Sequence, residues 1–257
     1  MTKIKTKKKF GQHFLINQDL ALEISEKLIL RKNIFEIGPG KGVLTKTFYN
    51  DENVNLVVSE IDRDLVDYLR TEYPYLDIMN GDVLDLNFRN IFNENYSIIG
   101  NLPYNISSQI LFKILENKSQ IHEFVVMLQK EVAERICSSE NKKSYGILSV
   151  LTQTYYDVTL SEVITPDNFD PPPKVNSCVV YGKRKKDIEI EIPFIKFKKI
   201  VKNCFHNRRK TLRNSLKNLN LPKEFTSNDI FSKRAEQLNL NEFLTLSTEI
   251  IKVNHEV

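Results

Sequence analysis

Residues 34–42 read IFEIGPGKG, a short apolar run that leads directly into a turn rich in glycine. Such a turn after the first strand of a parallel sheet lets the backbone approach a ligand closely at the carboxyl edge of the sheet. We expect a helix to follow it. The spacing GPGKG differs from the GxGxxG of dinucleotide sites, and by itself it also suits a phosphate site or an ordinary tight turn. The residues further along the chain decide between these functions.

The alternation of strand-like and helical patterns continues to about residue 128. Short apolar runs, separated by stretches with helical spacing, stand at 34–37, 55–60, 75–79, 96–101 and 123–128. This alternation predicts βαβ units, and hence an α/β, Rossmann-like fold with a mostly parallel seven-stranded sheet and helices on both faces. Two further runs, at 158–164 and 175–181, flank a proline-rich loop and predict an antiparallel hairpin at the edge of the sheet.

Beyond about residue 193 the pattern is helical only, with little apolar surface to bury alone. We therefore predict two domains. Residues 1–184 form the Rossmann-like catalytic domain, which carries a basic N-terminal tail. Residues 185–257 form a small all-helical domain that binds RNA.

The composition excludes several classes of protein. Hydrophobic residues make up 41% of the chain and charged residues 27%, as is usual for soluble globular proteins. No apolar run approaches the roughly 18 residues of a membrane helix, and none follows the basic N-terminus as in a secretory signal. Cys137, Cys178 and Cys204 have no CxxC spacing, and the histidines have no metal-ligand spacing. We therefore expect no metal, no membrane and a cytoplasmic location.

Two acidic residues stand where the second and third apolar runs end, Glu60 and Asp82. We expect Glu60 to accept hydrogen bonds from both hydroxyl groups of a ribose, and Asp82 to meet the amino group of an adenine. Either acid alone is also typical of a helix N-cap. Both acids at successive strand ends, together with Gly38 and Gly40 in the first turn, favour S-adenosylmethionine (SAM) as the cofactor.

The fourth apolar run leads into Asn101-Leu102-Pro103-Tyr104, which predicts a site for methylating an aromatic amine. Such an amine is a poor nucleophile because its lone pair is delocalised into the ring. Two acceptors on its N–H groups, the Asn101 side-chain carbonyl and the Leu102 backbone carbonyl in a turn fixed by Pro103, direct the lone pair at the methyl group. Tyr104 is expected to stack on the base. Positioning then does the catalytic work.

The proline-rich loop at 169–177 reads FDPPPKVNS. Its prolines stiffen the loop, so Phe169 is a candidate catalytic residue that stacks on the face of the base opposite Tyr104. A base held between two rings must first be flipped out of its own helical stack. The alternative is that Phe169 fills the core under the loop.

Positive charge is concentrated at the two ends of the chain. The net charge of +4 divides into −4 for residues 1–180 and +8 for residues 181–257. Basic residues at both ends suggest a polyanion such as RNA, although a solubilising surface gives the same composition. On a helix, residues 206, 209, 210 and 213 would share one face. The candidate RNA-binding residues are Lys7, Lys8, Lys9, His206, Arg208, Arg209, Lys210 and Arg213.

Six motifs occur in an order that resembles the rRNA adenine N6,N6-dimethyltransferase family, and most closely its bacterial 16S rRNA members. They are FGQHFL (10–15), GPGKG (38–42), EID (60–62), GD (81–82), GNLPYNIS (100–107) and FDPPPKVNS (169–177). The resemblance extends through FHNRRKTLRNSL (205–216) and so covers nearly the whole chain.

The resemblance implies dimethylation of two adjacent adenosines in the hairpin loop near the 3′ end of 16S rRNA, in a pre-30S particle. It also implies SAM contacts at His13, Leu15, Gly38, Glu60, Asp82 and Asn101. His13 departs from the family pattern, in which many members have asparagine. If its ring takes over the role of the amide, cofactor affinity becomes pH-dependent near neutrality.

Three other functions remain open. The sister family that methylates 23S rRNA and gives macrolide resistance shares the core and an NxPY motif. Pro39, Leu102 and the block 208–216 favour the 16S enzymes. A mainly non-catalytic ribosome-assembly factor would use the same fold, although the intact tetrad at 101–104 argues for chemistry. A DNA adenine methyltransferase would carry an inserted recognition domain, which is absent here. Nothing requires more than a monomer.

Overall fold

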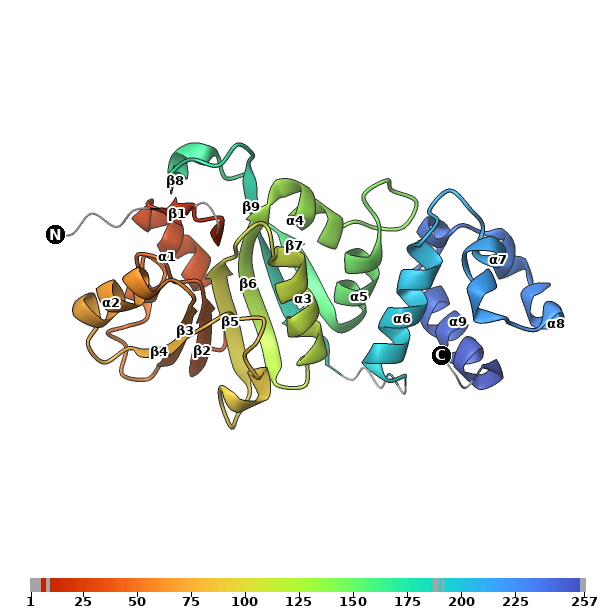
Figure 1. Cartoon of the computed structure of the whole chain (residues 1–257), viewed down its shortest axis with the longest axis horizontal. Helices are drawn as coiled ribbons and strands as arrows, with labels where there is room; N and C mark the ends of the chain where they lie inside the picture. Colours follow the sequence, from red (N-terminus) through yellow and green to blue (C-terminus); the bar gives the residue numbers. More distant parts are fainter. Residues whose placement is uncertain (1–5, 8–9, 187–189, 191, 255–257) are drawn as a thin grey trace. The chain divides into compact units, whose positions relative to one another are not determined.

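The computed structural model describes residues 6–7, 10–186, 190 and 192–254. It divides into two compact units, a sheet unit (1–133 and 156–184) and a helical unit (134–155 and 185–257) (Figure 1). The predicted boundary at residue 184 differs from this division, because 134–155 belongs to the helical unit.

The sheet unit contains a seven-stranded sheet in the order β4-β3-β2-β5-β6-β9-β7. Its parallel strands are β2 (Asn33–Ile37), β3 (Asn55–Glu60), β4 (Asp77–Asn80), β5 (Tyr96–Asn101) and β6 (Ile121–Gln129). β9 (Ser177–Arg184) lies antiparallel between β6 and β7 (Tyr156–Leu160). The predicted mostly parallel seven-stranded sheet is confirmed, and so is the antiparallel pairing of its last two strands.

The central strands are apolar because both faces of the sheet are covered there, whereas the edge strands β4 and β7 are partly exposed. All five residues of β2 are buried, as are the first five of β5. The helices of this unit are α1 (Gln18–Glu26), α2 (Arg63–Glu72) and α3 (Ser107–Glu116), and α4 (Lys130–Ile136) begins in it. Its 3₁₀ turns are η2 (Thr45–Thr47), η3 (Phe88–Asn90) and η4 (Pro166–Asn168).

The helix expected after the glycine turn is replaced by irregular turns that include η2. The backbone hydrogen bonds there are of two kinds. The Lys46 N–H donates to the Gly42 carbonyl, as in an α-helix, whereas the Thr47 N–H donates to the Leu44 carbonyl, as in a 3₁₀ turn. The Thr45 hydroxyl meanwhile donates to the buried Glu36 carboxyl group. Hydrogen bonds from such side chains compete with the regular backbone hydrogen bonds of a helix.

A second, two-stranded sheet joins distant parts of the sequence. β1 (Phe14–Leu15) pairs antiparallel with β8 (Phe169–Asp170). The backbone N–H of Ile16 extends the pairing by donating to Asn168. This sheet brings the N-terminal motif and the proline-rich loop to the same region as the strand ends of the large sheet.

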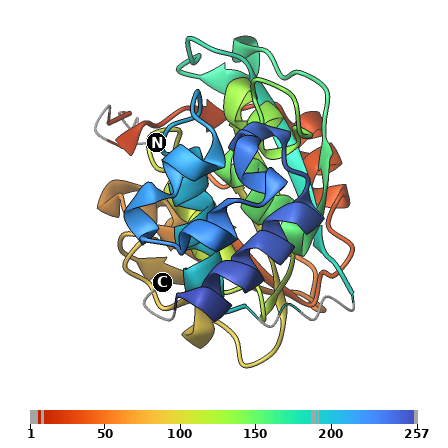
Figure 2. The same ribbon diagram turned by 90° about the vertical axis from the view of Figure 1, so that its right-hand side faces the viewer.

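The helical unit contains α5 (Ile147–Tyr155), α6 (Phe194–Phe205), α7 (Leu212–Ser215), α8 (Lys223–Thr226) and α9 (Leu240–Val253), with 3₁₀ turns η5 (Lys217–Leu219), η6 (Asp229–Ser232) and η7 (Ala235–Gln237) (Figure 2). Aromatic rings fill its core: Phe205 stacks on Phe243 at 5.7 Å, and Tyr145 meets Phe205 edge-on at 6.1 Å. Tyr145 lies in the segment 134–155, which explains why that segment belongs to this unit. None of the described helices is both long and apolar enough to cross a membrane.

Candidate active site

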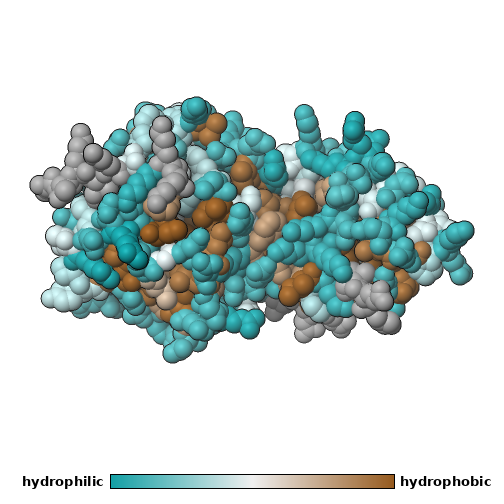
Figure 3. Space-filling view, viewed as in Figure 1, coloured by the Kyte–Doolittle hydropathy of each residue, from teal (hydrophilic) through white to brown (hydrophobic). Residues whose placement is uncertain are grey.

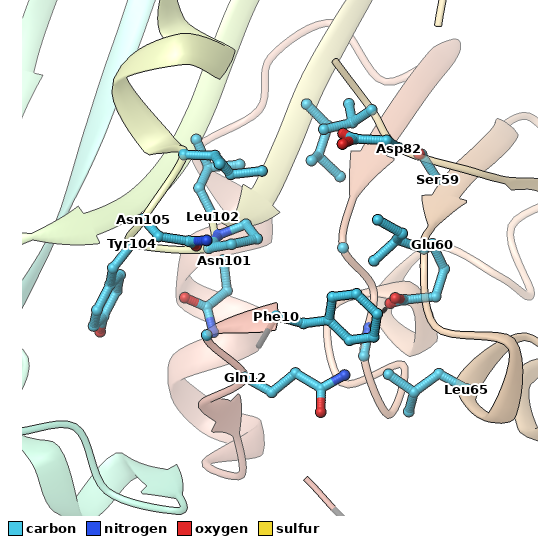
Figure 4. A pocket seen from close by; sticks show the side chains of 18 of the residues that line it. Phe10, Gln12, Ser59, Glu60, Leu65, Asp82, Asn101, Leu102, Tyr104 and Asn105 are labelled. Atoms are coloured by element: carbon cyan, nitrogen blue, oxygen red, sulfur yellow. Dashed lines mark hydrogen bonds between the residues drawn. The ribbon is translucent and has the colours of Figure 1, made fainter. Parts of the chain in front are cut away.

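A cavity of about 300 Å³ opens at the carboxyl ends of β2, β3, β4 and β5 (Figure 4). Parallel strands present their carboxyl ends at one edge of the sheet, so turns that are distant in sequence meet there. The predicted site residues that line this cavity are His13, Gly38, Gly40, Glu60, Asp82, Asn101, Leu102, Pro103 and Tyr104.

The turn after β2 requires glycine at Gly40 for two reasons. Its φ of +58° lies in the left-handed region, and a Cβ atom there would stand 2.8 Å from the Phe14 ring. Gly38, with φ +68°, donates its N–H to the Ser59 carbonyl. The backbone of this turn therefore forms one wall of the cavity without side chains to obstruct it.

Glu60 is 5% exposed and joins two walls of the cavity. One carboxylate oxygen accepts from the Gly40 N–H at 3.3 Å, and the other accepts from the Asp62 N–H at 2.9 Å. Burial raises the pKa of Glu60, and these backbone hydrogen bonds oppose the rise. Asp82 similarly accepts from the Leu84 N–H at 2.9 Å. Both acids thus bind backbone N–H groups and also line the cavity. Neither is a helix N-cap, because Asp62 caps α2 and residues 83–86 after Asp82 form only turns and a bend, so the N-cap alternative is wrong.

Glu36, in β2, carries the most perturbed carboxyl group near the glycine turn. It is 1% exposed, and burial raises its pKa from the ordinary 4.5 to about 8, partly offset by the hydroxyl of Thr45 at 2.7 Å. Since the folded state holds this proton more tightly than the unfolded chain, the stability it contributes is full below about pH 4.5 and is lost as the pH rises toward 8.

Glu36→Gln is therefore expected to flatten the fall in Tm between about pH 5 and 8, because a neutral amide does not ionise. Some slope will remain, since the pKa of Glu60 is also raised. Thermal unfolding of the wild type and the variant, without cofactor, measures both slopes. Equal slopes would contradict the assignment.

Asn101 ends β5 with its side chain held in one orientation. Its Nδ2 donates to the His13 carbonyl at 2.8 Å. The amide oxygen Oδ1 accepts no hydrogen bond from any residue that the structure describes, and the same holds for the Leu102 backbone carbonyl. The Leu102 N–H donates to the Met127 backbone carbonyl at 3.1 Å, and this hydrogen bond fixes the turn. The two acceptors predicted for an amine are therefore both free of partners within the described chain.

The Tyr104 ring is held at one face and at its tip. The His13 ring stacks on it at 5.6 Å with an interplanar angle of 26°. Its hydroxyl lies 2.6 Å from the Ser177 hydroxyl. Burial raises the pKa of Tyr104, so the phenol is neutral near pH 7. His13 thus covers one face of the ring, and Tyr104 also lines the cavity.

His13 connects three motifs that lie far apart in the sequence. Its carbonyl orients Asn101, its ring stacks on Tyr104, and Nδ1 lies 2.8 Å from the Pro171 carbonyl. A carbonyl oxygen only accepts, so Nδ1 carries the proton in this contact. The dependence of SAM affinity on pH stays a prediction, which titration with SAM between about pH 6 and 8 would test.

The N-terminal segment covers one side of the cavity, which Phe10 and Gln12 line. Lys7 pairs with Asp62 at 2.5 Å and with Asp64 at 2.7 Å, and Gln12 donates to Asp62 at 2.9 Å. Lys7, predicted to bind RNA, is therefore engaged by the acids at the start of α2. Lys8 and Lys9 lie outside the described residues.

Two predicted site residues lie in the core instead of the cavity. Phe169 is 2% exposed and packs in a cluster that includes Leu15, its partner across the two short strands. The prediction of Phe169 as a stacking platform is therefore wrong for this conformation, and the alternative of a core residue holds. Leu15 is 5% exposed in the same cluster and does not line the cavity.

The predicted basic stripe on one helix face is also wrong. α6 ends at Phe205, residues 206–210 form an exposed turn, and α7 begins at Leu212. Arg208 binds inward, because its guanidinium donates to the carbonyls of Lys143 and Tyr145 at 2.9 and 2.8 Å. His206, Arg209, Lys210 and Arg213 are exposed. The Arg208 side chain is itself 42% exposed, and Arg213 Nε donates to the Thr226 carbonyl at 3.1 Å. Hydrophilic residues cover much of the helical unit on the face that Figure 3 shows.

Several apolar residues of the cavity wall are not among the site residues predicted from the sequence. Ile61 directly follows Glu60, and Val83 directly follows Asp82. Leu65 lies in the first turn of α2. The signal was present for Ile61 and Val83, since each directly follows a strand-end acid. Within the described residues, no group of three histidine, cysteine or acidic side chains is placed to hold a metal ion.

Comparisons with known proteins agree on one relationship. A family model described as ribosomal RNA adenine dimethylase matches residues 3–252. The chain is 48% identical over 255 residues to ribosomal RNA small subunit methyltransferase A of Flavobacterium johnsoniae, with 97% of each chain covered. A dimethyladenosine transferase from Plasmodium falciparum has a similar structure, with a TM-score of 0.80, 25% identity, and coverage of 93% of this chain and 98% of that one. The 23S rRNA methyltransferase ErmE shares the fold, with a TM-score of 0.66, 23% identity, and coverage of 90% and 98%.

Proposed function

Because the chain belongs to the ribosomal RNA adenine dimethylase family, we propose that it dimethylates N6 of two adjacent adenosines in the hairpin loop near the 3′ end of 16S rRNA. Each adenosine receives two methyl groups from SAM. The substrate is a pre-30S particle in the cytoplasm, and the protein acts as a monomer. The proposal rests on one observation above the others: two fixed acceptors, Asn101 Oδ1 and the Leu102 carbonyl, with no partner in the described chain.

The cavity suits SAM in the chemistry of its donor and acceptor groups. Glu60 faces it with a carboxylate that can accept from two ribose hydroxyls, and Asp82 can accept from an adenine amino group. Ile61 and Val83 offer apolar surface beside these acids for a flat ring. SAM, when bound, supplies a methyl group on a positively charged sulfur. In this proposal Gly38 and Gly40 let the backbone approach the cofactor closely.

The catalytic role of the chain is to hold the amine. Asn101 Oδ1 and the Leu102 carbonyl each accept one N–H of the adenine amino group, which makes the nitrogen pyramidal and directs its lone pair. Tyr104 stacks on the base with the face that His13 does not cover. Transfer of the methyl group from SAM would leave the sulfur as the neutral thioether of S-adenosylhomocysteine. The nitrogen would carry the positive charge and would then release a proton to solvent. No general base is needed before attack, so positioning dominates.

Transfer of labelled methyl groups from SAM tests this function. Small subunits that lack the modification are the substrate, with 23S rRNA in parallel. Labelling of the small subunit alone at N6 of the two adenosines supports the proposal. Labelling of 23S rRNA would move the chain to the resistance-type activity. Tight particle binding without labelling would leave an assembly factor as the better interpretation.

Contact with rRNA is proposed for the exposed turn between α6 and α7 and for Arg213. Side chains on such a turn can follow a phosphate backbone, which positions the enzyme without giving sequence specificity. Arg209 and Arg208 form a matched pair, because they are adjacent but only Arg208 binds inward.

Arg209→Ala is expected to weaken binding to small subunits and to lower the slope of log affinity against log salt by about 1, as for one lost phosphate contact. Its Tm should be unchanged. Arg208→Ala is expected to lower Tm by about 2–4 °C, because two backbone carbonyls lose their donor. Salt-dependent binding and thermal unfolding of both variants give the comparison. The same Tm loss in both would contradict the distinction.

A further inference from the structure

Ser177 is the last residue of the proline-rich motif and has no place in the mechanism above. It is the first residue of β9 and is 0% exposed. Its hydroxyl lies 2.6 Å from the hydroxyl of Tyr104, 73 residues away in the sequence. A buried hydroxyl at this distance is a hydrogen-bond partner, so the tip of the Tyr104 ring is anchored at one point.

The anchor is rigid because the segments on both sides of Ser177 hold its backbone. Its N–H donates to the Ile164 carbonyl at 2.9 Å, and its own carbonyl accepts from the Ile164 N–H at 2.8 Å. On the other side it pairs with Gln129 at the end of β6. The backbone of Ser177 therefore has no freedom to follow a moving partner, and its hydroxyl is fixed at the sheet edge.

Tyr104 itself stands on the less regular turn after β5. Its ring has two side-chain torsions, and two contacts oppose their rotation: the His13 ring on one face and the Ser177 hydroxyl at the tip. Stacking alone allows a ring to slide in its own plane, whereas a hydrogen bond at the tip does not. Ser177 supplies the constraint that stacking lacks.

We propose that Ser177 is a positioning residue, which holds the Tyr104 ring in the plane needed to stack on the target adenine. This inference rests on the proposed function. Ser177 touches neither the cavity nor the reacting atoms. It acts only through Tyr104, so the effects of substituting Ser177 and Tyr104 on kcat should not be additive.

A double-mutant cycle of Ser177→Ala and Tyr104→Phe, measured in the labelled methyl-transfer assay, tests the inference. Each single variant is expected to lower kcat about tenfold, since a small misplacement of the base is costly. The double variant should be no slower than either single variant, because the same hydrogen bond is already lost. The Kd for SAM should stay within about twofold, since neither hydroxyl is assigned to the cofactor.

Ser97→Ala is the matched control. Ser97 is also a 0% exposed serine in the sheet, and its hydroxyl binds the Leu30 carbonyl at 2.7 Å, away from Tyr104. It should lower Tm with kcat unchanged. If Ser177→Ala behaves like this control, or if the losses in the cycle are additive, the inference is overturned while the proposed function stands. A wild type that transfers no methyl groups to small subunits would overturn the proposed function, and the inference with it.

Discussion

Asn101→Ala is expected to lower kcat for methyl transfer by about 10²–10³-fold at saturating SAM. The variant removes one of the two acceptors that hold the amine, and deleting one preorganised polar contact to a reacting group typically costs this much. The loss should appear in kcat, because the base still stacks on Tyr104 and the rRNA is still bound elsewhere. Single-turnover labelling of small subunits, with SAM binding measured by titration, separates the chemical step from cofactor affinity.

Asn101→Asp tests whether the orientation of the side-chain oxygen matters, or only the presence of an acceptor at this position. Aspartate keeps a side-chain oxygen in the position of Oδ1 but places a second oxygen against the His13 carbonyl, where Nδ2 now donates at 2.8 Å. Repulsion between these oxygens should turn the side chain away, so this variant is also expected to be slow. Asn90→Ala, at an exposed asparagine at the end of η3, should leave kcat unchanged. Activity of Asn101→Ala within about fivefold of wild type would refute the role of the side-chain acceptor.

The sheet and the order of its site motifs were predictable because they follow from local patterns. Apolar runs indicated the strands, and parallel strands bring their carboxyl ends to one edge whatever lies between them. Glu60, Asp82 and Asn101 therefore had to converge once the strands were recognised, and all three line the cavity.

Contacts between residues distant in sequence were not predictable. The pairing of β1 with β8 joins Leu15 to Phe169, and two-residue strands carry no periodicity from which to recognise them. That pairing explains why Phe169 is in the core. It also places His13, one residue before β1, beside Pro171 and Tyr104. A single sequence shows the motif residues, but it does not show which of them bind one another.

The helical unit exposed a second limit. Residues 206–213 have charges at helical spacing, but spacing alone does not reveal that the chain turns after Phe205. Arg208 binds inward because the backbone carbonyls of Lys143 and Tyr145 need a donor. The same contacts draw 134–155 into this unit, so the boundary expected at residue 184 describes only part of the division.

Gly182→Ala is expected to destabilise the protein by about 2–3 kcal/mol, the cost of overpacking a well-packed core. Gly182 in β9 lies directly opposite Phe124 in β6, and a Cβ atom there would stand 2.2 Å from the Phe124 ring. The ring cannot move aside, because it is 0% exposed and packs edge-on against Tyr156 at 5.1 Å. The Tyr156 hydroxyl is in turn bound to the Ile121 carbonyl. Tm should fall by about 5–10 °C.

Gly146→Ala and Phe124→Leu distinguish this clash from a general effect of replacing glycine. A Cβ atom at Gly146 meets no atom within 4 Å, so that variant should keep its Tm or gain slightly as the unfolded chain loses freedom. Phe124→Leu alone leaves a void and should lower Tm, but it opens the space that a methyl group at position 182 would need. The variant that combines Phe124→Leu with Gly182→Ala should therefore lose less stability than the sum of the two singles. Strict additivity, measured by thermal and denaturant unfolding, would mean that the Phe124 ring is not what keeps position 182 a glycine.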